Sequence, residues 1–289
     1  MNRFSKSIAL LLAALLLFSS TACGQKQPEA SVDTPPAVET PEAPSASENH
    51  PAEPVVQVEI PELGVKIAEL KSKNDDCVGW LKIPDTEVDA GVMYHENKEF
   101  YHRKNELKDY SWTGCYYADY ECSFGATADD LMRSTVIYGH NVDYNDDKDG
   151  MRFSQLFHFA DKKWAEEHPY IFFSTPEEDL MWEIFAVAYT TTDFQYIQVL
   201  KDRKVSSTEQ ITEAQMMKIV NAARERSEYD YPDVEVTGDD KIITLSTCSY
   251  KYGRRDDVRF IVMAKLVTED DVLVERANIK INEDKKEVQ

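Results

Sequence analysis

Two residues able to do covalent chemistry stand at the ends of short apolar runs. Cys248 ends K-I-I-T-L-S-T-C, and His140 closes V-I-Y-G-H-N. A side chain at the end of a strand is exposed at the rim of a sheet that still aims it. A thiolate with a proton-transfer partner carries out nucleophilic acyl transfer. Taken alone, a cysteine that ends a strand is more often a small buried apolar residue.

The elements that would position these residues are mostly short. Runs rich in β-branched and aromatic residues, separated by turn residues, predict strands near 79–83, 115–118, 134–138, 170–173, 181–188, 241–247 and 259–267. Many short strands in one domain predict a closed barrel or a sandwich. Apolar residues at helical spacing predict a helix over 62–74 and a longer one near 206–229, with Ser206 and Glu209 as its capping box. We therefore expect a mainly β domain.

The first 55 residues differ in composition from the remainder. Arg3 and Lys6 precede an apolar run over 8–18, and small residues follow it before Cys23, which is the order of a secretory signal. The run is too short to span a bilayer, which needs roughly 20 residues. The segment S-T-A-C-G is similar to a bacterial lipobox. We expect a signal peptide over 1–22 and lipid on Cys23, with a retained signal anchor or simple secretion as alternatives.

Residues 24 to about 55 are dominated by Pro, Ala, Glu, Ser and Thr. Such a composition buries too little apolar surface to offset the entropy of ordering. We therefore expect a disordered tether over 23–55 and one folded catalytic domain over 56–289. This organisation places the domain at the outer face of a cell membrane.

The charge balance excludes one class of partner. Lys and Arg number 32 against 53 Asp and Glu, a net charge of -21, which repels nucleic acid and anionic lipid.

The run from Asn145 to Gly150 imitates the start of a calcium loop, but Leu156 stands where a bidentate Glu is required. We expect no metal and no cofactor. Cys115 and Cys122 are interpreted as buried or unpaired thiols rather than a disulfide.

Several motifs together resemble the sortases, a family of cysteine transpeptidases. The segment T-L-S-T-C, followed after a spacer by R-F-I-V, is similar to the sortase signature, and Y-G-H-N resembles the segment with the family's histidine. The segments D-C-V-G-W-L-K-I-P-D-T-E-V-D-A-G-V, G-C-Y-Y-A-D-Y and F-S-Q-L-F resemble class B members in order. The resemblance covers about residues 74–267 and implies a closed barrel of about eight strands.

The resemblance also implies roles for individual residues. Cys248 would be the nucleophile, His140 its proton-transfer partner and Arg259 the guanidinium that holds a carbonyl or an oxyanion. The backbone N–H of Ser249 would be a second oxyanion donor. Arg259 directly precedes an apolar run, whereas the other two arginines after Cys248 lie in a polar segment with two aspartates. We expect those two, Arg254 and Arg255, to be solvated surface residues.

A further segment, T-D-F-Q-Y-I, resembles the loop that clamps the substrate peptide in this class. It suggests Thr192, Tyr196 and Ile197 as substrate-binding residues, with Ser246 beside the nucleophile. Tyr196 is equally compatible with an ordinary half-buried barrel residue.

The implied reaction is acyl transfer. The thiolate would cleave an Asn-Pro-x-Thr-like C-terminal sorting signal of an exported protein and form a thioester, which an amine of a peptidoglycan precursor would take over. Two alternatives remain open. An L,D-transpeptidase would need Ser-His-Gly before the cysteine and Arg two residues after it, and neither is found. A catalytically silent surface lipoprotein would use the same barrel only for binding.

Overall fold

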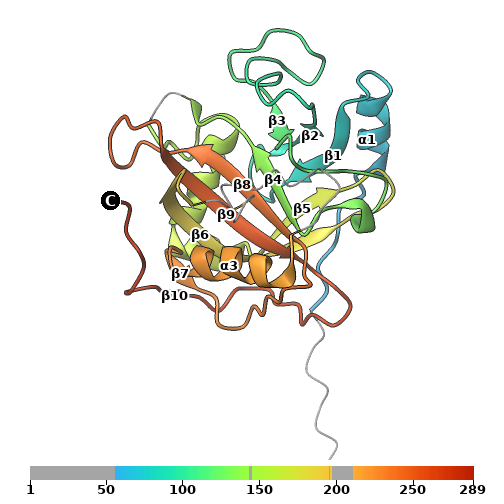
Figure 1. Cartoon of the computed structure of the whole chain (residues 1–289). Coiled ribbons are helices and arrows are strands. Elements are labelled where there is room, and N and C mark those ends of the chain that lie inside the picture. Colours follow the sequence, from blue (N-terminus) through green and yellow to red (C-terminus); the bar gives the residue numbers. More distant parts are fainter. Residues whose placement is uncertain (1–55, 143–144, 195, 197–210) are drawn as a thin grey trace, which may run out of the picture. The chain divides into compact units, whose positions relative to one another are not determined.

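Strands close into a barrel in the part of the chain that the computed structural model describes, which is residues 56–142, 145–194, 196 and 211–289 (Figure 1). The barrel strands are β1 (Cys77–Lys82), β2 (Asp89–Met93), β3 (Tyr116–Ala118), β4 (Ser134–Tyr138), β5 (Tyr170–Ser174), β6 (Met181–Thr191), β8 (Ile242–Cys248) and β9 (Val258–Leu266). Their order around the barrel is β1-β2-β3-β4-β8-β9-β6-β5. The predicted mainly β fold with a closed eight-stranded barrel is confirmed.

The barrel is mixed, with two parallel pairs. β2 pairs with β3 and β4 pairs with β8 in parallel, whereas the remaining barrel neighbours are antiparallel. The longest ladder joins β6 to β9, from the pair Trp182 and Leu266 to the pair Thr191 and Val258. Both strands are buried almost throughout, which agrees with their continuous apolar sequences. This ladder is the rigid support for the rim at which β8 and β9 meet.

The helices cover parts of the barrel. In the described part of the chain they include α1 (Gly64–Lys71), α2 (Lys162–Glu167), α3 (Glu213–Arg224) and 3₁₀ helices over Ala128–Asp130 and Phe153–Ala160. In Figure 1, α3 lies against the barrel below β6 and β9, and α1 lies beside β1. Outside the barrel, β7 (Tyr229–Asp230) pairs with β10 (Lys280–Ile281). Among the described residues, no helix has both the length and the apolar character needed to cross a bilayer.

The predicted longer helix exists but its limits were wrong. α3 begins after Thr212, whose side chain accepts a hydrogen bond from the Gln215 N–H, while the Gln215 side chain accepts from the Thr212 N–H at 2.8 Å. This reciprocal pair is the capping box, and the predicted box at Ser206 and Glu209 lies outside the described residues. The helix ends at Arg224, because the chain then leaves to form β7.

The N-terminal helix is also shorter than predicted, and one strand of the barrel was missed, as were the two short strands β7 and β10. α1 covers Gly64–Lys71 within the expected range 62–74. β2 has the sequence D-A-G-V-M, in which Asp, Ala and Gly have low β-propensity. It becomes a strand because β1 and β3 pair with it from either side. Long-range pairing therefore overrides local preference in this segment.

Candidate active site

The register of two neighbouring strands brings the predicted nucleophile and histidine to one level. β4 and β8 run parallel, with Tyr138 opposite Ser246. Two residues further along each chain stand His140 and Cys248. Since parallel strands advance together, both residues reach the same rim of the barrel.

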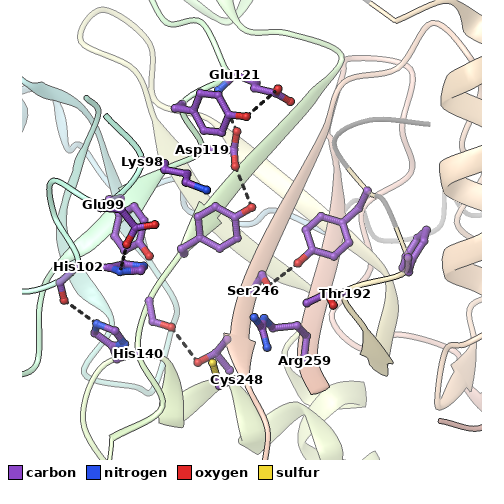
Figure 2. A pocket seen from close by; sticks show the side chains of 17 residues that line it. Lys98, Glu99, His102, Asp119, Glu121, His140, Thr192, Ser246, Cys248 and Arg259 are labelled. Atoms are coloured by element: carbon purple, nitrogen blue, oxygen red, sulfur yellow. Dashed lines mark hydrogen bonds and ion pairs between the residues drawn. The ribbon is translucent and has the colours of Figure 1, made fainter. Parts of the chain in front are cut away.

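A cavity of about 490 Å³ opens at this rim (Figure 2). Its lining includes His140, Thr192, Tyr196, Ser246, Cys248 and Arg259. Figure 2 shows His140 and His102 on one side, with Cys248 and Arg259 across from them. The structure thus brings together six of the residues selected from the sequence. Ile197, selected with them, lies outside the described residues, as does Cys23.

Arg259 stands directly opposite Cys248 in the antiparallel ladder between β8 and β9. Its Nη1 donates to the carbonyl oxygens of Asp256 at 2.8 Å and Val258 at 2.9 Å. These bonds hold the guanidinium at the end of the strand, half-buried in the cavity wall. Arg255 instead forms a bidentate pair with Asp257, at 2.9 and 2.7 Å, and is not among the residues that line the cavity. The geometry therefore distinguishes Arg259 from its neighbour.

His140 is held by its surroundings in one protonation form. Its Nε2 lies 2.7 Å from the backbone oxygen of His102. Because a carbonyl only accepts, Nε2 carries a proton and Nδ1 keeps the lone pair of the neutral ring. Burial lowers the pKa of His140, which favours that neutral form. A neutral imidazole with a free Nδ1 can accept a proton from a thiol.

Two glycines allow this histidine to sit where it does. A Cβ on Gly139 would lie 2.7 Å from the Phe153 ring, so Gly139 is required by close packing. Gly114 has a φ of +61°, and a Cβ there would lie 3.0 Å from Cδ2 of His140. Gly114 was not selected from the sequence, because its contact with His140 crosses between segments.

The backbone N–H of Ser249 is engaged in this structure. It donates to the Val258 carbonyl at 3.2 Å and so continues the ladder between β8 and β9. The Ser249 hydroxyl donates to Oδ2 of Asp146 at 2.6 Å, and the residue is fully buried. As an oxyanion donor, this N–H would first have to leave the Val258 carbonyl.

A network that the sequence did not reveal ties the loop after His140 to the chain after Cys248. Oδ1 of Asp146 accepts from the Tyr250 N–H at 2.8 Å and from Nδ2 of Asn141 at 2.6 Å. The same Asn141 amide donates to the Cys248 carbonyl at 3.0 Å. Asp146 lies in the run 145–150, which we interpreted as an imitation of a calcium loop, and nothing in that run distinguishes it from the other acidic residues. The position of Asn141, directly after His140, was the available signal.

The predicted substrate-binding residues share one part of the cavity wall. The Tyr196 hydroxyl lies 2.9 Å from Oγ of Ser246, and both residues are buried. Thr192 is exposed at the mouth of the cavity, and its N–H donates to the Asp257 carbonyl at 2.8 Å. Tyr196 is thus both a wall of the cavity and a packed residue.

The opposite wall carries polar residues that the sequence analysis missed. The Tyr138 hydroxyl donates to Oδ2 of Asp119 at 2.9 Å, and burial raises the pKa of Asp119. Nδ1 of His102 lies 2.7 Å from a carboxylate oxygen of Glu99. Tyr138 ends the predicted strand 134–138, whereas Glu99, His102 and Asp119 come from segments between the predicted strands. Only the closure of the barrel brings all of them to the cavity.

A thiol, an imidazole and a guanidinium around a cavity at the rim of a closed barrel define a class of cysteine acyltransferases. The family model for the sortase domain matches residues 81–267 of the sequence, and the chain therefore belongs to the sortase family. It is 30% identical over 272 residues to sortase B of Listeria monocytogenes, covering 91% of this chain and 96% of that protein. It is 25% identical over 198 residues to sortase B of Staphylococcus aureus, covering 68% and 73% of the two chains.

The fold agrees with solved structures of the same class. A Staphylococcus aureus sortase B–substrate complex superposes with a TM-score of 0.57 at 23% identity, covering 71% of this chain and 86% of that chain. The prediction of a class B-like sortase is confirmed, and the chain is a cysteine transpeptidase of the cell envelope that acts on sorting signals and amine acceptors. Neither alternative, an L,D-transpeptidase or a silent binding lipoprotein, is favoured by these similarities.

Proposed function

We propose that Cys248, His140 and Arg259 carry out the reaction. Neutral His140 accepts the thiol proton, and the sulfur of Cys248 attacks the scissile carbonyl, so that a C–S bond forms and the carbonyl electrons move to oxygen. The intermediate collapses as the C–N bond breaks and the leaving amine takes the proton from His140. A thioester remains on Cys248. The observation that supports this assignment is that the three groups line one cavity.

Arg259 is the proposed oxyanion donor. Its guanidinium is fixed opposite Cys248 by two hydrogen bonds to backbone carbonyls. A preorganised donor of this kind stabilises charge that develops only in the transition state. The Ser249 N–H joins it only in a conformation that has released the Val258 carbonyl.

The substrate proposal concerns the cavity beyond the three groups. Thr192, Tyr196 and Ser246 form one wall. We propose Ile197 as a further substrate-binding residue on the basis of the family motif alone. The sorting signal is of the Asn-Pro-x-Thr type, in an exported protein. The acceptor is an amine of a peptidoglycan precursor. No metal or cofactor takes part in this mechanism.

The location of the enzyme follows from its N-terminal segment. We propose a signal peptide over 1–22, lipid on Cys23, a tether over 23–55 and a catalytic domain over 56–289. The lipobox-like sequence before Cys23 and the composition after it support this division. The domain would then stand off the outer face of the membrane, where exported proteins pass.

A peptide library tests the proposed function. The full chain is incubated with sorting peptides that differ at each position, and cleavage is read by mass spectrometry with and without triglycine. We expect cleavage after Thr in an Asn-Pro-x-Thr-like peptide, a thioester mass on Cys248 and transfer to triglycine. Cys248→Ala is the matched control and should show none of these. Wild-type protein that cleaves no peptide and forms no adduct would contradict the proposal.

A further inference from the structure

A second histidine lines the same cavity. The rings of His102 and His140 are 5.9 Å apart between centroids, on the side of the cavity opposite Cys248 (Figure 2). The backbone oxygen of His102 holds His140, whereas its side chain takes no part in that bond. No step of the proposed mechanism uses the His102 side chain.

The His102 side chain is paired with a carboxylate. Nδ1 lies 2.7 Å from Oε2 of Glu99, and the ring also contacts the edge of Tyr117 at 5.6 Å between centroids. Since a carboxylate accepts, Nδ1 donates and Nε2 has the lone pair in the neutral ring. A carboxylate that orients an imidazole and stabilises its protonated form is a recurring arrangement for a general base.

The transfer step releases one proton that does not return to the sulfur through His140. An acceptor amine arrives as an ammonium, and it loses two protons before it is an amide nitrogen. When the new C–N bond forms and the C–S bond breaks, the sulfur takes back one proton through His140. One proton remains for each turnover, and it must leave the ammonium before attack, because only the neutral amine has a lone pair.

We propose that His102, oriented by Glu99, is a catalytic general base that takes this proton from the acceptor ammonium. The inference rests on the proposed function and assigns the acceptor side of the cavity to the wall with His102. His140 is buried and returns its proton to the thiol. The His102 side chain is 45% exposed and Glu99 is 60% exposed, so that the proton can pass to water.

The charged groups around His102 suit an ammonium. Glu99 is paired with it, and the cavity wall continues to Asp119 and Glu121, with Lys98 as the cation on the same wall. Arg259, the other cation of the cavity lining, stands on the far side with Cys248 (Figure 2). The two walls therefore separate the site of the oxyanion from the site of the incoming cation.

The test measures the partition of the thioester between transfer and hydrolysis. His102→Gln in the full chain is given a cleavable sorting peptide with triglycine, whose α-amino group has a pKa of about 7.7–8.0 and is mainly charged at pH 7. Only about 9–17% of this amine is neutral at pH 7, so without the base transfer to triglycine should fall about six- to elevenfold relative to hydrolysis. The readout is the ratio of transfer to hydrolysis, so that any change in the rate of cleavage itself cancels. Glu99→Gln should give a smaller loss.

A second acceptor separates base catalysis from a structural effect. Hydroxylamine is already neutral at pH 7, so His102→Gln should transfer the acyl group to it as wild type does. Transfer to triglycine should likewise recover at pH 9, where that amine is neutral. The matched control is His168→Gln, because His168 also pairs with a carboxylate, Asp85 at 3.1 Å, but is not among the cavity residues. It should behave as wild type with both acceptors.

Two results would overturn the inference while leaving the proposed function intact. One is a His102→Gln enzyme with the wild-type partition toward triglycine, which shows that the side chain has no role. The other is an equal loss with triglycine and hydroxylamine, which shows a structural role. Wild-type protein that forms no thioester on Cys248 would instead refute the proposed function and the inference together.

Discussion

The guanidinium of Arg259 and that of Arg255 differ in what holds them. Two backbone carbonyls anchor one Nη of Arg259 at the cavity, whereas Arg255 is paired with Asp257 in a salt bridge outside the cavity lining. Two arginines only four positions apart therefore differ in their surroundings, one at the cavity and the other in a salt bridge. Arg259 lies on β9 and lines the cavity, whereas Arg255 precedes that strand.

Substitution of each arginine by lysine tests this difference. Arg259→Lys keeps the charge but loses the planar fork, so we expect peptide cleavage to fall by about 10²–10³, the usual effect of losing one oxyanion donor. Arg254→Lys and Arg255→Lys should remain close to wild type. Cleavage rates of the three purified variants are the measurement. An active Arg259→Lys beside an inactive Arg255→Lys would show that the wrong arginine was assigned.

The lowered pKa of His140 predicts the acid limb of the activity profile. Burial favours the neutral ring, so the group that accepts the thiol proton stays available below the usual histidine pKa of about 6.5. We expect kcat/KM for peptide cleavage to fall on acidification with a midpoint below 6.5. The folded protein should also lose stability as pH falls through about 6.5, because the unfolded chain binds that proton more readily.

Kinetics from pH 4 to 9 and urea melts at the same pH values measure both effects. His140→Ala should be nearly inactive, by roughly 10²–10⁴, and should lack the histidine-dependent part of the stability change. An acid limb centred above 7 would contradict the neutral buried form.

At the scale of elements, hydrogen bonds connect the segment after β4 to the segment after β8 at the rim of the barrel. Asp146 bonds Ser249 and Tyr250, and Asn141 bonds the Cys248 carbonyl. These contacts couple the chain after β4 to the chain after β8. Hydrogen bonds to a carboxylate are stronger than neutral ones, so the contribution of Asp146 to this coupling is large.

In Asp146→Ala, the segment that carries Cys248 should be held less firmly. We expect kcat for peptide cleavage to fall about tenfold or more with little change in KM, and stability to fall by about 1–3 kcal/mol, because the buried hydroxyl of Ser249 loses its acceptor. Alkylation of Cys248 by iodoacetamide needs no alignment with His140 and should change less than cleavage. Asp149→Asn, an exposed position on the same loop, is the matched control. Parallel losses in cleavage and alkylation would argue against a positioning role.

At the scale of the whole molecule, all strands of the barrel lie in the described residues from Val56 onward. The described residues belong to one compact unit with its own apolar core. A polar, Pro-rich segment contributes little to such a core.

Deletion of residues 1–55 should therefore leave folding and cleavage unchanged, while release from the membrane becomes complete. Thermal unfolding and peptide cleavage of the shortened protein test the first part. Mass spectrometry of the mature full-length protein tests the anchor, with a lipid increment expected on Cys23 as the new N-terminus. A mature N-terminus elsewhere, without added mass on Cys23, would rule out the anchor.

The sequence alone determined the features that depend on local pattern. The β-branched and aromatic residues of 134–138 predicted β4 with its observed bounds, and the motif T-L-S-T-C selected the residue that ends β8. These predictions succeeded because side-chain shape and apolar spacing act on neighbouring residues. The order of the motifs along the chain also predicted the family.

The tertiary structure decided what depends on distant segments. Asp146 and Ser249 are 103 positions apart, and neither sequence neighbourhood indicates their hydrogen bond. The engaged N–H of Ser249, the pairing that makes β2 a strand and the placement of His102 beside His140 have the same origin. Hydrogen-bond partners and burial are properties of the closed barrel, because only closure brings these segments within bonding distance.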